Sequence, residues 1–420
     1  MKKFIFLIIA IVAIVVGVVF WPLIIPQYSP AEYMNEGNVL DNSVATSAIE
    51  LESRIVVLNN KKEVTFRLPK EFDITVAAED LGKARFMAES PDGRVFVPDM
   101  VNYNLSHEGK IFILENFDEK TGSFQNKHTY LSGLRGPNSL AFYTDKDGQD
   151  WLYIALTAHL IRYKYAAGDI VPSSKPEIII EFPNTQTPGE TSVVWHITRT
   201  LLFQKDTLYV AIGSGCNSCE QPTDETRAMI FSIDPNGKNV RMYANGLRNA
   251  VGIEWAKGSL YATENGVDHM GPGSPNEVMY KIDEGKHYGW PYCYELNGIL
   301  QEDTSQEWNR EFSCEDFPLS LAAFDPHSAP LGLTYFEDAH PALKGFFLVS
   351  LHGSFQPEIG TGYKIMRVSG NGTQDVFMEG FLSEEGERVA RPVHILQKDK
   401  NSFFLTDDHG GRIYYIYAAR

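Results

Sequence analysis

The sequence predicts an all-β protein, a six-bladed β-propeller preceded by one N-terminal transmembrane helix. Three observations support this: strand-sized apolar runs separated by Asp-Gly, Asn-Gly and Lys-Gly turns, almost no helical periodicity after residue 26, and six copies of one repeating unit. Hydrophobic residues make up 43% and aromatic residues 12% of the 420 residues, enough to bury a large core. The net charge of −17 argues against a nucleic-acid partner, because phosphate binding requires clustered basic charge.

The chain begins with an uncharged apolar run behind two lysines. Residues 4–25 span about 33 Å as a helix, close to the hydrocarbon thickness of a bilayer. A secretory signal peptide is the alternative, but its apolar region is shorter and ends at small residues. We favour an uncleaved anchor over residues 1–26 and a polar tether over 27–50. Because the lysines precede the span and acidic residues follow it, the remaining chain is expected to be periplasmic or extracellular.

The propeller domain is predicted over residues 51–420. Its six copies each contain a short apolar run, a polar turn, a second run rich in Val, Leu, Tyr or Phe, and a β-branched or aromatic strand, and they begin at residues 84, 136, 198, 247, 329 and 390. Their spacing is longer than the roughly 40–50 residues of common propeller repeats, so each copy carries a loop insertion. We expect residues 51–80, with Ile55–Leu58 and Val64–Leu68, to complete the ring by pairing with the last blade.

Four cysteines in an exported domain suggest two disulfides. The local pairing joins Cys216 with Cys219 and Cys293 with Cys314, and the second bridge would clamp a surface insertion. A catalytic dithiol is the alternative for the Cys-Asn-Ser-Cys segment, but no thioredoxin-like βαβ pattern surrounds it. The next residue is Glu220 and not His, so the attachment motif for c-type haem is missing and no haem is expected.

A propeller fold alone does not define a function, and four stretches carry more specific information. They are Trp-His-Ile-Thr-Arg-Thr at 195–200, Gly-Leu-Arg-Asn-Ala-Val-Gly at 246–252, residues 271–277 followed by His-Tyr-Gly-Trp-Pro at 287–291, and Ser-Leu-His-Gly-Ser at 350–354 followed by Gly-Tyr-Lys at 362–364. In order and blade placement they resemble the glucose/sorbosone dehydrogenase family, quinoproteins that oxidise sugars with pyrroloquinoline quinone (PQQ) and calcium. The resemblance covers roughly residues 70–418 and looks closest to the sorbosone dehydrogenase branch.

The resemblance implies a catalytic base and two residues that face substrate and quinone. Oxidation needs a base for the hydroxyl proton while hydride leaves carbon, and His196 matches the family's base position. Arg248 and Asn249 match the family pair, with Arg248 as the candidate that stabilises negative charge on the quinone oxygens. A satisfied loop histidine and a salt bridge between blades are the structural alternatives for His196 and Arg248.

The resemblance also implies a calcium site. In this family, backbone carbonyls of a Gly-Pro pair supply some of the ligands and the cofactor supplies others, which maps onto Gly271 and Pro272. The residues between Pro272 and Glu277 depart from the family's usual acidic and Gly-rich spelling.

PQQ carries three carboxylates, so its pocket is expected to be cationic. Arg391 is the best positional match, with Arg388 and Arg412 as additions. His352 occupies the position of a lysine in the glucose dehydrogenase branch, and a histidine holds a carboxylate less strongly and in a pH-dependent way. Lys364 is a further candidate for compensating this difference, and a solvated surface lysine is the alternative.

The sequence therefore predicts a membrane-anchored, externally facing sugar dehydrogenase that depends on PQQ and calcium. The reaction would convert an aldose to a lactone, or a sorbosone-type aldehyde to an acid, and pass electrons to an external quinone or cytochrome. Two alternatives remain: a non-catalytic propeller displayed on the membrane as a binding module, and a propeller lactonase, which uses side-chain carboxylates around calcium.

Overall fold

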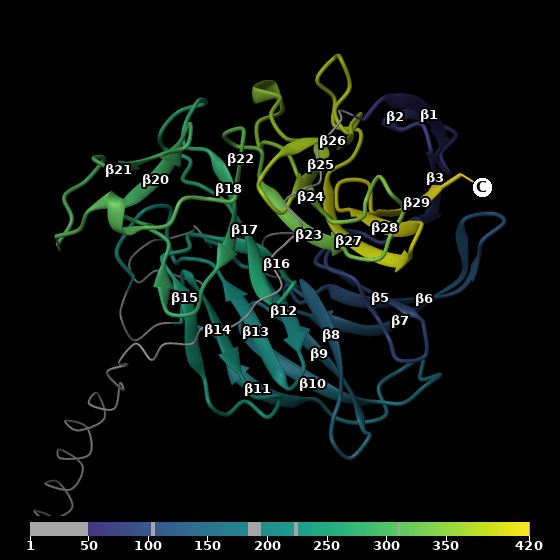
Figure 1. The fold of residues 1–420 in the computed structure, drawn as a ribbon. Coiled ribbons are helices and arrows are strands. Elements are labelled where there is room, and N and C mark those ends of the chain that lie inside the picture. The colour runs from purple at the N-terminus through teal and green to yellow at the C-terminus, as the bar shows by residue number, and fades with distance from the viewer. Residues whose placement is uncertain (1–48, 102–105, 184–194, 222–225, 310, 420) are drawn as a thin grey trace, which may run out of the picture. The chain divides into compact units, whose positions relative to one another are not determined.

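The computed structural model confirms the six-bladed β-propeller (Figure 1). It describes residues 49–101, 106–183, 195–221, 226–309 and 311–419. The predicted anchor and nearly all of the tether fall outside these ranges. Within them, no helix has the length and apolar character needed to cross a bilayer.

Each blade is an antiparallel sheet whose strands follow the order of the chain. Blade one contains β4 (Ala88–Glu89), β5 (Val95–Asp99), β6 (Gly109–Asp118) and β7 (Ser123–Leu134). Blade two contains β8 (Ser139–Thr144), β9 (Asp150–Ala155), β10 (His159–Tyr165) and β11 (Glu177–Glu181). Blade three contains β12 (Arg199–Gln204), β13 (Thr207–Ile212), β14 (Met229–Ile233) and β15 (Arg241–Asn245), with β19 (Lys286–His287) added in parallel.

The fourth and fifth blades follow the same pattern, and the sixth combines the two ends of the domain. Blade four contains β16 (Ala250–Ala256), β17 (Ser259–Glu264), β18 (Glu277–Ile282) and β22 (Ala322–Phe324). Blade five contains β23 (Pro330–Phe336), β24 (Phe346–Leu351), β25 (Lys364–Ser369) and β26 (Gln374–Met378). Blade six contains β27 (Pro392–Asp399), β28 (Ser402–Asp407), β29 (Arg412–Ala418) and β3 (Phe72–Ala78).

The first strand of a blade is its inner strand, and inner strands of successive blades contact one another from β4 through β8, β12, β16 and β23 to β27. These strands begin at residues 88, 139, 199, 250, 330 and 392, close to the predicted repeat starts. The turn between β4 and β5 shows the local cause. The amide of Gly93 donates to the carbonyl of Ser90 at 2.8 Å, and Gly93 adopts a φ of 80°, which glycine accommodates without strain.

Ring closure differs in detail from the prediction. The strand that pairs with β29 is β3, which does lie within residues 51–80. The two runs that were expected to close the ring are instead β1 (Leu51–Val57) and β2 (Glu63–Pro69), which form a separate two-stranded hairpin. A backbone bridge between Arg67 and Glu379 links this hairpin to the end of blade five, and the buried Phe66 of the hairpin packs in the same core cluster as Phe377. Alternating apolar residues indicated strands here but not their partners.

The hydrophobic core lies between the faces of adjacent blades. The cluster between blades one and two includes Phe96, Ile113, Leu152 and Ile154, all fully buried. Burial of such side chains contributes roughly 1.5–3 kcal/mol each. Because every blade packs on two neighbours, this core stabilises the loops at the ends of the central channel.

Both predicted disulfides are present, joining Cys216 to Cys219 and Cys293 to Cys314. The second clamps the excursion between β19 and β22, which holds the hairpin of β20 (Cys293–Leu296) and β21 (Ile299–Glu302). A 3₁₀ turn, η2 (Cys314–Asp316), follows β21 in the chain, and a second one, η3 (Pro357–Ile359), lies between β24 and β25. Figure 1 shows the β20–β21 hairpin outside the blades.

Candidate active site

His196 lies just before the inner strand of blade three, with a left-handed φ of 43°. Its Nδ1 is 3.0 Å from the carbonyl oxygen of Ser214 and 2.9 Å from the Ser214 hydroxyl. A carbonyl oxygen only accepts, so Nδ1 carries the proton in this bond and the lone pair is on Nε2. Burial, followed by the charge of Arg248, holds the pKa of His196 well below its usual value. His196 is therefore a neutral imidazole, as a general base requires.

Arg248 is buried at the start of blade four, where a side-chain cation needs several partners. Its Nε donates to the carbonyl of Asn217 at 2.9 Å, and its Nη2 donates to the Asn217 Oδ1 at 2.6 Å. Further bonds run from Nη1 to the carbonyl of Asn265 at 3.2 Å and from Nη2 to Asp268 at 2.8 Å. The Asp268 carboxylate is 65% exposed, so this salt bridge faces solvent and is not buried between blades.

Asn249 and His196 converge on Gly213. A Cβ atom on Gly213 would lie 2.5 Å from His196 Cβ and 2.6 Å from Asn249 Oδ1, so only glycine permits this approach. The backbone amide of Asn249 donates to Glu264 Oε1 at 2.9 Å. The Asn249 Oδ1 is buried and has no hydrogen-bond partner among the described residues. Since buried polar atoms are normally paired, this amide oxygen indicates a position where a ligand or water binds.

A chain of hydrogen bonds leads from His196 around the ring to blade one. The Nη1 of the fully buried Arg199 donates to the His196 carbonyl at 2.6 Å. Asn138 then donates to the carbonyl of Arg199 at 2.9 Å and accepts from Arg85 Nε at 3.0 Å. Blades one, two and three are thus joined by polar contacts at the same end of the channel.

The series of hydrogen bonds continues from Arg85 through Asp408 to blades five and six. Asp408 accepts from Arg85 Nη1 at 2.8 Å and contacts His352 Nε2 at 2.8 Å, and all three side chains are buried. Burial alone would raise the pKa of Asp408, but His352 and Arg85 lower it below its usual range. Burial lowers the pKa of His352 to about 4 despite the carboxylate. His352 is therefore uncharged at neutral pH and offers no cation for a carboxylate.

The remaining predicted cofactor residues separate into two groups. Arg391 lies beside His352 and donates to the carbonyls of His352 and Gly353 at 3.2 and 2.5 Å. Arg388 lies nearby, where its Nε donates to the Tyr363 hydroxyl at 3.1 Å. These two arginines are near the polar chain described above.

Lys364 and Arg412 lie on third strands, away from the inner strands. Lys364 begins β25 and lines a surface groove between blade five and the β1–β2 hairpin, together with Arg67. Arg412 begins β29 and its Nε donates to Glu79 at 2.9 Å. The structure does not bring either residue to His196.

The predicted calcium loop contacts the segment that leads into blade five. The carbonyl of Gly271 is 2.8 Å from His327 Nε2, which donates to it. Pro272 is exposed. In the part of the chain that the structure describes, no group of three or more His, Cys, Asp or Glu side chains is arranged to hold a metal ion.

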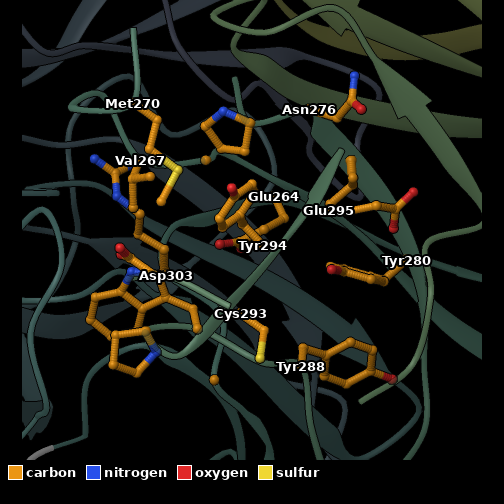
Figure 2. Close-up of a pocket in the computed structure, with 17 residues that line it drawn as sticks. Glu264, Val267, Met270, Asn276, Tyr280, Tyr288, Cys293, Tyr294, Glu295 and Asp303 are labelled. Carbon is orange, nitrogen blue, oxygen red and sulfur yellow. The ribbon is translucent and has the colours of Figure 1, made fainter. Parts of the chain in front are cut away.

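A small cavity of about 40 Å³ lies behind Arg248, with Glu264 and three tyrosines in its wall (Figure 2). Figure 2 shows Tyr280 and Tyr288 on one side and Asp303 on the other. This volume accommodates water but not an organic cofactor. Burial raises the pKa of Glu264 to about 8, so its carboxyl group stays protonated at neutral pH.

Several site residues were not predicted from the sequence. Arg85 interrupts an otherwise apolar run, which is the one local signal of a buried charge with a partner elsewhere. Asp408 follows a second aspartate, Asp407, and neither residue was given a role from the sequence. Ser214 and Asn217 were not recognised, because their contacts with His196 and Arg248 depend on how blade three folds.

The described residues form a six-bladed propeller that joins basic and imidazole groups at one end of its channel, where the neutral His196 can act as a base. The chain belongs to the TrAA12-like family, whose model matches residues 67–419. This match confirms the resemblance to PQQ-dependent sugar dehydrogenases inferred from the sequence. An uncharacterised protein of Borreliella burgdorferi is 24% identical over 392 residues, which cover 88% of this chain and 96% of that protein.

Solved structures share the fold at low sequence identity. The calcium structure of the Trichoderma reesei family AA12 enzyme is 18% identical with a TM-score of 0.69, covering 84% of this chain and 96% of that one. The holo PQQ domain of pyranose dehydrogenase from Coprinopsis cinerea is 17% identical, with a TM-score of 0.66 and coverages of 84% and 97%. The PQQ-bound aldose sugar dehydrogenase from Streptomyces coelicolor is 18% identical, with a TM-score of 0.57 and coverages of 83% and 99%.

Proposed function

We propose that this protein oxidises a sugar with PQQ as the bound electron acceptor. The observation that carries the proposal is the convergence of His196 and Asn249 on Gly213, with Arg248 beside them. Family membership and the PQQ-containing structural neighbours support the same reaction class. Consistent with the apolar N-terminal run, we propose an anchored enzyme that acts in the periplasm or outside the cell, on an aldose or a sorbosone-type aldehyde.

The residues at this end of the channel fit an anionic, hydrogen-bonding cofactor. Arg391 and Arg248 supply cationic groups near the ends of the polar chain, and Arg388 adds a third. The buried Asn249 amide has an oxygen without a partner among the described residues, as expected of a group that contacts a ligand. We assign these four residues to PQQ binding, with His352 contributing as a neutral group.

His196 performs the proton transfer in this proposal. When bound, PQQ supplies the two-electron acceptor for the hydride that leaves the sugar carbon. The Nε2 lone pair of His196 accepts the hydroxyl proton, while the Ser214 carbonyl holds Nδ1–H and fixes the orientation of the ring. Because the imidazole is neutral well below pH 6.5, the base is available across the physiological range.

Calcium fits this chain only in combination with the cofactor. Gly271 and Pro272 supply uncharged carbonyl oxygens, and the Gly271 oxygen already accepts from His327. Neutral carbonyls bind calcium weakly unless further oxygen ligands complete the shell. We therefore propose that calcium binds after, or together with, PQQ.

The test is reconstitution of the purified protein with PQQ and calcium, followed by a screen of aldoses, sorbosone and simple alcohols with an artificial electron acceptor. We expect His196→Asn, which tolerates the left-handed φ, and His196→Ala to lower turnover about 10²–10⁴-fold while PQQ still binds. His128→Ala, at a half-buried position on the outer strand β7, serves as a control without a change in turnover. Unchanged turnover in the His196 variants would remove the base from this mechanism. PQQ binding without oxidation of any substrate would favour a binding module.

A further inference from the structure

The Cys216–Cys219 loop lies between the two groups that the proposed reaction uses. Its disulfide closes a ring around Asn217 and Ser218. The loop follows β13, so it stands at the same channel end as His196. The side chains of Asn217 and Ser218 contact different parts of the protein, which makes them a matched pair for comparison.

Asn217 holds the guanidinium of Arg248 through two atoms. Its carbonyl accepts from Arg248 Nε at 2.9 Å and its Oδ1 accepts from Arg248 Nη2 at 2.6 Å. Two of the guanidinium's contacts therefore come from one residue. Other contacts orient Asn217 itself: its Oδ1 also accepts from the Asp268 amide at 3.2 Å, and its carbonyl accepts from Trp290 Nε1 at 3.3 Å.

The same loop reaches His196 through one intermediate residue. The hydroxyl of Ser214 donates to the carbonyl of Cys216 at 2.6 Å, and that hydroxyl oxygen lies 2.9 Å from His196 Nδ1. The amide of Gln221 lies 3.0 and 3.5 Å from the two disulfide sulfurs and fixes the far side of the ring. The ring closed by the disulfide thus contains Asn217, which orients Arg248, and contacts Ser214, which orients His196.

Ser218 shares the ring but does not contact Arg248. Its hydroxyl donates to Asp303 at 3.0 Å, and its carbonyl accepts from Gln306 at 2.9 Å. These bonds attach the ring to the excursion that the Cys293–Cys314 disulfide clamps. Loss of the Ser218 hydroxyl tests attachment of the loop without altering the contacts of Asn217.

We propose that Asn217, restrained by the Cys216–Cys219 disulfide, is a positioning residue that holds the Arg248 guanidinium in its reactive orientation. This inference rests on the proposed function, since it names how that site is ordered. A long arginine side chain has many rotamers in the absence of partners, so a single orientation requires fixed acceptors. Because a misplacement of about 1 Å can cost 10²-fold in rate, the ring affects turnover without touching the substrate.

Two variants test the proposal. Asn217→Ala removes the Oδ1 acceptor, and the double variant Cys216→Ser, Cys219→Ser opens the ring while keeping similar side-chain volumes. We expect each to lower kcat about 10–10²-fold, with KM changed less than 3-fold, because hydrogen bonds to a charged group are worth this range. Asn217→Asp keeps an acceptor at the same place and should restore kcat to within a few-fold of wild type.

The controls are Ser218→Ala and the double variant Cys293→Ser, Cys314→Ser, both of which should retain wild-type kcat at a temperature where they are folded. Crystal structures of the variants give a readout independent of turnover, and we expect a displaced Arg248 guanidinium in Asn217→Ala. An undisplaced guanidinium with wild-type kcat, or an equal loss of kcat in the controls, would overturn the proposal. If wild-type protein oxidises no sugar, the proposed function fails, and the crystal structures alone decide the positioning role.

Discussion

Among the buried site residues, Asp408 is the one at which we expect an isosteric substitution to reduce the stability of the protein most. Asp408→Asn keeps the size of the side chain but removes its charge and replaces one acceptor oxygen by an NH₂ group. Arg85 then loses its counter-charge at 3% exposure. The two oxygens of Asp408 now contact Arg85 Nη1 and His352 Nε2 separately, and the substitution replaces one of them by an NH₂ group.

The expected cost follows from this burial. Removing one partner of a buried ion pair costs about 3–5 kcal/mol, because the remaining charge has no compensation. Such a loss is a large fraction of the 5–15 kcal/mol by which domains are usually stable. The double variant Arg85→Gln, Asp408→Asn removes both charges, so we expect it to be more stable than Asp408→Asn alone.

The assay is equilibrium unfolding in urea, followed by tryptophan fluorescence, with m-values compared between variants. Asp338→Asn provides the control, since Asp338 pairs with Lys400 on the exposed surface and its loss should leave the midpoint unchanged. The reasoning fails if the free energy of unfolding of Asp408→Asn lies within about 1 kcal/mol of the wild-type value, or if the double variant is no more stable than Asp408→Asn.

Three further predictions concern protons and ligands. Since Glu264 has a pKa of about 8 in the folded protein against 4.5 ordinarily, the folded state keeps a proton that the unfolded state loses, and stability should fall as pH rises from about 5 to 8. Denaturation series at several pH values should show that Glu264→Gln flattens this slope by about 1.4 kcal/mol per pH unit; an unchanged slope would contradict the assignment. Calcium and PQQ should enhance each other's affinity by the same factor in either order of addition, as linkage requires, and calorimetric titrations showing independent affinities would place calcium elsewhere. Because burial lowers the pKa of His196, kcat/KM should show no acidic limb near pH 6.5, and a pH–rate profile with a midpoint there would contradict a neutral buried base.

The repeat pattern was sufficient to predict the blades but not the partner of every strand. Inner strands could be placed because each copy repeats the same apolar run and turn. The segment over residues 51–80 holds three strand-like runs, and alternation alone does not distinguish them. The three strands β1, β2 and β3 each have seven residues, and β3 is the one that pairs with β29, so tertiary packing and not the strand pattern selected it.

The candidate site was predicted to a similar extent. His196, Arg248 and Asn249 stand in short motifs at the beginnings of inner strands. The structure brings His196 and Asn249 together at Gly213, and the carbonyl of Arg248 accepts from the amide of the neighbouring Ser214 at 2.7 Å. Lys364 also stood in a motif, but it begins a third strand and lines a separate groove. Membership of a family-like motif therefore did not by itself predict that a residue lies near His196.

The sequence by itself determined the strand pattern, the number of blades, the two disulfides and the residue types available for catalysis, because these depend on periodicity and on local spacing. The tertiary structure decided the pairing of Arg85 with Asp408 across 323 positions of the chain. It also decided the neutral state of His352 and the hold of Asn217 on Arg248. Such contacts form only where loops from different blades meet, and the charge states there depend on burial that no local pattern specifies.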